Sequence, residues 1–317
     1  MSDPGIGAAG YVGVALETVP GEYTAPTKFF PIRSEGMQWQ NNPILRRVIR
    51  GTADPIGAVP GDGHVEGDID SEALEDVIPY FLRCARGDLT QTGAEAPYTY
   101  EFVPNHKAVP DNTMSLVVVR NEIVFGYTGL VVSSFNFSLD EGMLVVTWSL
   151  IGREESEQTD PGPPAYGDDE PFGAGSYELY IPASAQDPVE DTDNFSFQVD
   201  DGGEPQNRLI NRRGAAFVSY GERSTQLTME RDFLSRDDYN KFKALTEEGI
   251  NLRSEKDADH YVELEVPASI QETHEIPLSG VGDLVRSSIT YQGIHDATIG
   301  AAYKITLGTD EDLGLVV

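Results

Sequence analysis

Residues 130–150 read LVVSSFNFSLDEGMLVVTWSL. Phe135, Phe137 and Leu139 occupy alternate positions, with Asn and Ser between them, which is the period of a strand that has one buried face and one solvated face. Residues 140–142 are turn-forming, and the same alternation resumes at residues 144–150. The stretch therefore predicts an antiparallel hairpin in a mainly β protein.

The pattern around this hairpin occurs twice in the chain. Each copy contains a strand, then a polar-capped helix, and finally a strand that opens with Gly-x-Leu-Val. These segments are residues 64–69, 71–82 and 142–150 in the first copy, and 226–230, 235–245 and 282–291 in the second. We therefore expect a mainly β (α+β) fold of two similar units, each a pair of antiparallel sheets forming a sandwich or partial barrel with one flanking helix.

The predicted domain boundaries follow from composition. Residues 1–152 form the first unit with an N-terminal arm, 153–175 form an acidic linker rich in Gly and Pro, and 176–317 form the second unit with a C-terminal arm. Within the first unit, residues 28–32 and 37–40 are expected to pair as a hairpin. Residues 51–67 are expected to form a long exposed loop that reaches a neighbouring subunit.

Each predicted helix has a serine N-cap and an apolar stripe at three- and four-residue spacing. The first is capped by Ser71 and the second by Ser235. We expect both stripes to pack on a sheet. The stripe residues are Leu74, Val77, Ile78 and Phe81 in the first helix, and Tyr239, Phe242 and Leu245 in the second.

The 317-residue chain is strongly acidic, with 53 Asp and Glu against 22 Lys and Arg, a net charge of -31. This balance disfavours nucleic-acid binding through phosphate neutralisation. Acid excess with only six lysines is typical of proteins from high-salt cytoplasms, although charge that serves only solubility is the alternative. The N-terminus lacks the pattern of a signal peptide, and no apolar run approaches the length of a membrane span, so we expect a soluble protein.

No group of residues predicts catalysis, a cofactor or a metal. Residues 5–10 spell the dinucleotide fingerprint, but no strand precedes them. The acidic runs at 68–72 and 191–194 lack the glycine and distal glutamate of a calcium loop. The five histidines are scattered, and the single Cys84 is expected to be a buried thiol. We therefore predict no catalytic, cofactor-binding or metal residues and no enzyme.

Four segments together resemble the tail tube (major tail) proteins of long-tailed, siphovirus-like viruses. They are the opening residues 10–17, the segment 41–43 with its following loop, the strand 64–69 that leads into the first helix, and the hairpin that ends at Gly152. Combined with the acidic composition, the resemblance suggests a virus of a halophilic archaeon. It implies subunits that join sheets edge to edge into rings, and rings that stack into a tube for genome ejection.

The resemblance also implies partners and a location. With two units per chain, three chains would supply the six units that are usual for the family. The unequal spacing of the copies leaves open one tube domain with a decorative β domain and six chains per ring. Tape measure, tail terminator and baseplate proteins are the expected partners, DNA passes through the lumen without specific binding, and no membrane is involved. The protein would be assembled in the host cytoplasm and reside in the virion tail.

Two other functions were considered from the residues. Aromatic side chains and acidic loops would suit a carbohydrate-binding or adhesive β-sandwich, and the excess of carboxylates could conceal a glycan-cleaving enzyme. For the aromatic residues, packing in the core or at interfaces is the expected role. These residues are Trp39, Tyr98, Tyr100, Trp148 and Tyr180.

Overall fold

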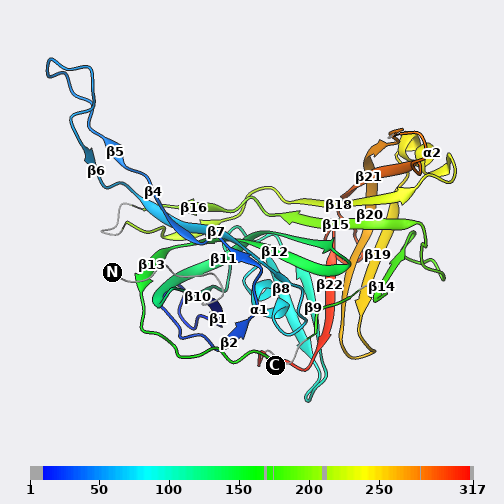
Figure 1. Ribbon diagram of the computed structural model, residues 1–317, viewed down its shortest axis with the longest axis horizontal. Coiled ribbons are helices and arrows are strands. Elements are labelled where there is room, and N and C mark those ends of the chain that lie inside the picture. The colour runs from blue at the N-terminus through cyan, green and yellow to red at the C-terminus, as the bar shows by residue number, and fades with distance from the viewer. Residues whose placement is uncertain (1–9, 168–169, 174, 209–212, 279, 315–317) are drawn as a thin grey trace.

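The computed structural model describes residues 10–167, 170–173, 175–208, 213–278 and 280–314. It is mainly β with antiparallel sheets and two helices, which confirms the predicted fold class, and no sheet closes into a barrel (Figure 1). The strands are β1 Tyr11–Leu16, β2 Lys28–Phe30, β3 Ser34–Glu35, β4 Gln38–Asn41, β5 Ile44–Leu45, β6 Ala58–Val59, β7 Gly63–Glu72, β8 Gly87–Thr92, β9 Tyr98–Pro104, β10 Met114–Arg120, β11 Ile123–Asp140, β12 Met143–Gly152, β13 Glu154–Glu157, β14 Tyr177–Tyr180, β15 Thr192–Asp200, β16 Glu204–Gln206, β17 Phe217–Ser219, β18 Ser224–Asp232, β19 Glu248–Glu255, β20 Tyr261–Glu275, β21 Arg286–Gly293 and β22 Lys304–Thr309; the helices are α1 Ile78–Arg83 and α2 Asp237–Ala244.

Eight strands form the principal layer of the molecule. Their order is β4–β7–β12–β11–β15–β18–β21–β20, and every pair is antiparallel. The short strand β3 also pairs with β7, next to β4. The layer therefore passes without a break from the first half of the sequence into the second, through the pair β11–β15.

Two long strands leave this layer and enter smaller sheets. The first part of β11 joins β2, β1, β10 and β13, and the first part of β20 joins β14, β19, β22, β9 and β8. In β11 the change occurs at Gly129, whose φ of +64° suits glycine and rarely suits other residues. β11 and β20 thus each contribute to two sheets.

The hairpin predicted from residues 130–150 is confirmed as β11 and β12. Its registered pairs include Phe135↔Trp148 and Phe137↔Val146, and all four side chains are buried. A bulge between Val132 and Ser134 shifts the alternation. The side chains on either side of that bulge consequently follow opposite parities.

Three local predictions were wrong. Residues 28–32 and 37–40 do not pair, because β2 pairs with β1 while β4 pairs with β7. Ser71 does not cap a helix, since β7 continues through Glu72 along β12 and the first helix begins only at Ile78. Residues 51–67 do not form one loop, because β6 lies within them and β7 begins at Gly63.

One aromatic core joins the two halves of the sequence. Trp148 stacks on Phe81 of α1 at 4.8 Å between ring centroids and also contacts Phe135. Phe135 in turn lies 6.2 Å from Tyr303 of the second half, and Tyr303 also contacts Phe197. All five side chains are at most 2% exposed, so both halves bury their aromatic residues together.

The two helices differ in burial. The four residues predicted to form the stripe of the first helix are buried, since Leu74, Val77, Ile78 and Phe81 are each at most 2% exposed, but only Ile78 and Phe81 lie on α1. In α2 no residue is buried, and Leu245 at its C-terminal end is 63% exposed. The prediction that this stripe packs on a sheet is confirmed for Tyr239 and Phe242, whose rings contact His274 of β20, and wrong for Leu245.

A buried ion cluster also crosses between the halves. The Asp201 carboxylate accepts a hydrogen bond from Arg223 Nε at 2.6 Å, and Arg86 of the first half lies 3.7 Å away. Arg223 also donates to the main-chain carbonyls of Arg86 and Asn105. Burial raises the pKa of Asp201, although both guanidinium groups act in the opposite direction. The cluster therefore connects three chain segments through one carboxylate.

Phe81→Ala should lower the free energy of unfolding by about 3–5 kcal/mol, because it removes the ring stacked on Trp148 and leaves a cavity. Phe242→Ala, the matched change on α2, should cost about 1 kcal/mol or less, since that ring is only half-buried. Urea denaturation of both variants checks this difference. Equal losses would show that α2 is as firmly packed as α1.

Arg223→Ala should destabilise the chain by roughly 3–5 kcal/mol, because it leaves the Asp201 carboxylate buried with a weaker partner. Lys107→Ala removes an exposed ion pair with Asp111 and should change stability by less than about 1 kcal/mol. Thermal and urea unfolding provide the measurement. Wild-type stability of Arg223→Ala would contradict a structural role for the cluster.

Candidate assembly surfaces

The order of strand pairing in the first half occurs again in the second half. In the first, β4–β7–β12–β11 lie side by side and β11 continues between β10 and β13. In the second, β15–β18–β21–β20 lie side by side and β20 continues between β19 and β22. The helix follows β7 in one half and β18 in the other. Among the described residues, the hairpin β8–β9 of the first half has no counterpart in the second.

The register repeats as well as the order. The β11–β12 ladder breaks between Val132 and Ser134, and the β20–β21 ladder breaks between Gln271 and Thr273. Both differences are 139 residues (271 − 132 and 273 − 134). Matching bulges also interrupt β10–β11 and β19–β20. Because bulges are specific local features, this coincidence makes the two sets of strands equivalent position by position.

A hairpin interrupts each set at the same place. β5 and β6 lie between β4 and β7, and β16 and β17 lie between β15 and β18. The pair Ile44↔Val59 corresponds to Glu204↔Ser219 with an offset of 160 at both positions (204 − 44 and 219 − 59). Trp39↔Val65 and Val199↔Thr225 have the same offset. Both hairpins are therefore inserted at the same position and have the same length.

The hairpin of the second half lies across the first half. Val218 and Tyr220 form a small apolar cluster with Val131 and Ile151 of β11 and β12. Farther along, the Arg213 carbonyl accepts a hydrogen bond from Gly63 N–H at 2.8 Å. The hairpin β16–β17 thus crosses the strand layer from β15 to β7.

The hairpin of the first half has no such cover. β5 and β6 project away from the molecule at the upper left of Figure 1. Its exposed side chains are Ile44, Leu45, Val48, Ile49 and Val59, with exposures from 42% to 104%. Three arginines, at positions 46, 47 and 50, lie in the same hairpin of this acidic chain. Exposed apolar groups that lie together mark a surface for protein contact.

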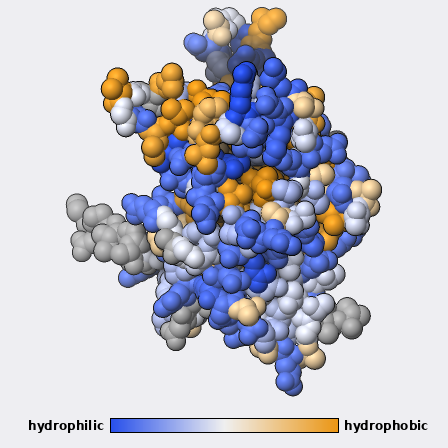
Figure 2. Space-filling view, turned by 90° about the vertical axis from the view of Figure 1, so that its right-hand side faces the viewer, coloured by the Kyte–Doolittle hydropathy of each residue, from blue (hydrophilic) through white to orange (hydrophobic). Residues whose placement is uncertain are grey.

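Both ends of the eight-stranded layer are open in the described chain. β4 pairs only with β7, and the second part of β20 pairs only with β21 apart from the contact Ser269↔Glu248. Unpaired main-chain groups along such edges favour pairing with another strand. An apolar patch lies beside the β20 edge, where Figure 2 shows hydrophobic side chains gathered near α2 and β21. It contains Leu234, Leu245, Leu278, Val281 and Leu284.

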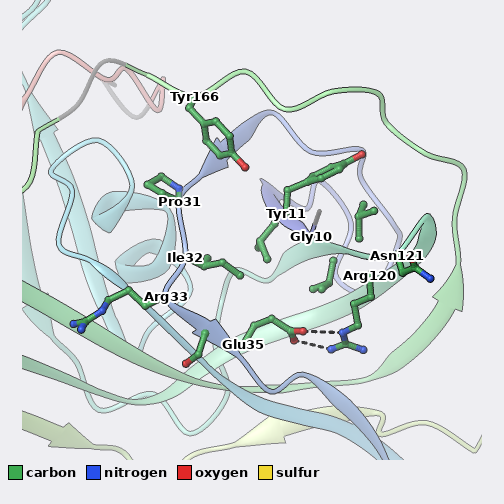
Figure 3. A pocket seen from close by; sticks show the side chains of 13 residues that line it. Gly10, Tyr11, Pro31, Ile32, Arg33, Glu35, Arg120, Asn121 and Tyr166 are labelled. Carbon is green, nitrogen blue, oxygen red and sulfur yellow. Dashed lines mark hydrogen bonds and ion pairs between the residues drawn. The ribbon is translucent and has the colours of Figure 1, made fainter. Parts of the chain in front are cut away.

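A pocket between β1, β3, β10 and the segment 31–33 offers no catalytic arrangement (Figure 3). Its charged side chains already have partners: Arg120 donates to both Glu35 carboxylate oxygens at 2.7 and 2.6 Å, and Arg33 pairs with Asp140 outside the pocket. Tyr11 at its rim donates to Asp160 at 2.7 Å, and burial raises the pKa of Tyr11 to about 12. The charged groups of the described lining are thus engaged in structural contacts.

The structure brings together only part of the residues that could carry chemistry: the rings of His106 and His295 lie 6.3 Å apart between centroids. No group of three metal-ligating side chains occurs among the described residues, and no described helix is long and apolar enough to span a membrane. Cys84 is buried, and burial raises its pKa. His64 pairs with Glu66, while His260 pairs with Asp257. Residues 5–9 of the glycine motif lie outside the described residues.

The aromatic residues considered for sugar binding are not a platform. Tyr100 and Trp148 are fully buried, and Trp148 belongs to the common core. The sequence predicted assembly through sheet edges and through a loop at residues 51–67, but it did not predict the hairpin β5–β6 or which strands form the edges. Only the cluster of apolar residues and arginines at positions 44–50 could have indicated that hairpin.

Comparison with known proteins agrees with surfaces built for assembly. The family model described as Phage tail tube protein matches residues 7–293. No curated protein matches the chain. The match spans nearly the whole sequence, so the chain belongs to the phage tail tube protein family and is a structural component of a viral tail.

Proposed function

We propose that the chain is the repeating subunit of the tail tube, with two equivalent tube units per chain and three chains per ring. The repeated strand order and the matching bulges support the two-unit organisation. The single observation that carries ring assembly is the pairing of β11 with β15, because it already joins two equivalent units edge to edge. A head-to-tail interface of this kind closes into a ring when the rotation permits.

In this proposal the two open edges close the ring. Each chain contributes eight strands to one layer, so three chains would supply a continuous inner wall without free edges.

The sequence predicts that segment 153–175 is a linker. Its first residues belong to the first unit, because β13 pairs with β11. The fully buried Phe172 then anchors the later part of the segment at β12, where Leu144 N–H donates to its carbonyl.

The solvent-exposed face of the eight-stranded layer has the properties expected of the inner wall of a DNA conduit. Its central side chains are short and uncharged, and several bind one another: Ser196 donates to Asn136 at 2.8 Å, and the hydroxyls of Thr228 and Thr290 lie 3.2 Å apart. Asp68 and Glu230 add negative charge, none of the eight strands contains lysine, and Arg286 on β21 is paired with Asp193 and Asp232. Such a wall would repel phosphates, so DNA would pass without binding.

The proposed location and partners follow from the membership of the chain in a tail tube family. Rings would stack into a tube in the host cytoplasm and remain in the virion tail, with tape measure, tail terminator and baseplate proteins at the tube ends. A high-salt host would suit the net charge of -31, because salt screens repulsion between acidic subunits.

Rings assembled from the purified chain in molar salt should contain three copies. Native mass spectrometry gives the number of chains per ring, and negative-stain microscopy shows whether rings stack into tubes. Six chains per ring would favour one tube domain with a decorative domain. Discrete particles that never form rings would contradict the proposed function.

Lysines placed on the proposed lumen wall should make the tube retain DNA. Tubes of the triple variant Asn136→Lys, Thr228→Lys and Thr290→Lys should protect short duplex DNA from nuclease, and wild-type tubes should not. The matched control places three lysines at Thr90, Thr92 and Thr99 of the hairpin β8–β9. Equal protection by both variants would show that this sheet face does not line the lumen.

A further inference from the structure

We propose that the contact between the two halves of one chain is repeated between chains, so that the second part of β20 pairs with β4 of the next copy. This inference rests on the proposed tail-tube function and names the strands, the register and the hairpin that would close the ring. Its basis is the position-by-position equivalence of the two sets of strands.

The register follows from the two constant offsets. β20 corresponds to β11 with an offset of 139, and β4 corresponds to β15 with an offset of 160. The pair Ser134↔Asp200 therefore becomes Thr273↔Gln40, because 134 + 139 = 273 and 200 − 160 = 40. By the same arithmetic, Asn136↔Gln198 becomes Glu275↔Gln38.

Burial at the two edges fits this register. Thr273 and Glu275 are exposed on β20, as Gln38 is on β4, so their side chains are accessible. Between them, the buried pair Phe135↔Val199 becomes His274↔Trp39. His274 is 8% exposed beneath the rings of Tyr239 and Phe242, and burial lowers its pKa. A neutral imidazole beside Trp39 would extend the core across the junction.

In the same arrangement, the exposed hairpin β5–β6 of one copy would pack against a surface of the next copy. Within the chain, Val218 of β17 packs against Val131 of β11. The offsets convert this contact into Ala58 of one copy against Ile270 of the next (218 − 160 = 58 and 131 + 139 = 270). The hairpin β5–β6 would then cross β21 and β18 of the neighbour, as β16–β17 crosses β12 and β7.

Charge also favours a second copy of the chain as the partner of the hairpin β5–β6. The hairpin carries Arg46, Arg47 and Arg50, and its end would reach the region where β15 and β18 meet. Asp200 and Glu222 are exposed in that region. A second copy of this acidic chain therefore offers both the apolar strip and the negative charge that the basic, apolar hairpin requires.

Cysteine pairs test the register directly, because the single native Cys84 is buried. Gln40→Cys with Thr273→Cys, and separately Ala58→Cys with Ile270→Cys, are assembled into rings and oxidised with copper phenanthroline. Gln40 and Thr273 would be opposite residues in an antiparallel pair, whose Cα atoms are about 4.5–5.5 Å apart and within disulfide range. Ala58 and Ile270 would instead meet across a packed face, as Val218 and Val131 do within the chain. Ser134→Cys with Asp200→Cys is the positive control and should form a bond within one chain. Gln40→Cys with Glu230→Cys is the mismatched control, two strands away from β20.

Both test pairs should give covalent dimers and trimers on denaturing gels, with no species above three chains and at least tenfold more product than the mismatched control. Normal rings and tubes without this excess would overturn the proposed register and leave the tail-tube function intact. Failure of the wild-type chain to form any ring would contradict the proposed function and this inference together.

Discussion

The structure depends on the requirement that main-chain N–H and C=O groups along a strand find partners. Inside the chain this requirement is met where β15 lies along β11, which turns two four-stranded sets into one eight-stranded layer. The aromatic core and the Asp201 cluster both lie across this junction. Pairing, apolar burial and buried charge therefore stabilise the same contact between the halves.

The same requirement is unmet at the two ends of the layer. β4 and the second part of β20 present free edges, and natural proteins rarely leave such edges uncovered. In the proposed ring, closure would pair these edges. An assembly protein can therefore retain open edges in its isolated subunit, because they become interior strands after assembly.

The two sets of strands differ where their surroundings differ. α1 lies in the core beneath Trp148, whereas α2 has no buried residue. β16–β17 packs against its own chain, whereas β5–β6 projects with Ile49 fully exposed. These differences place apolar surface on the first hairpin and beside α2. Both surfaces are available for contacts between copies.

Local sequence patterns determined much of the fold. Alternation fixed the hairpin of β11 and β12, and the spacing of Leu74, Val77, Ile78 and Phe81 identified buried positions even though Leu74 and Val77 precede the helix. Such features depend on near neighbours, whose periodicity is set by backbone geometry.

Only the tertiary structure decided which strands pair and what the helices bury. Ser71 has the chemistry of a helix cap, yet the ladder between β7 and β12 keeps it in a strand. The spacing of the serine pair, 235 − 71 = 164, concealed the constant offset of 160 that the strand registers reveal. Strand partners lie far apart in sequence, and packing of the common core selects among registers that local patterns leave open.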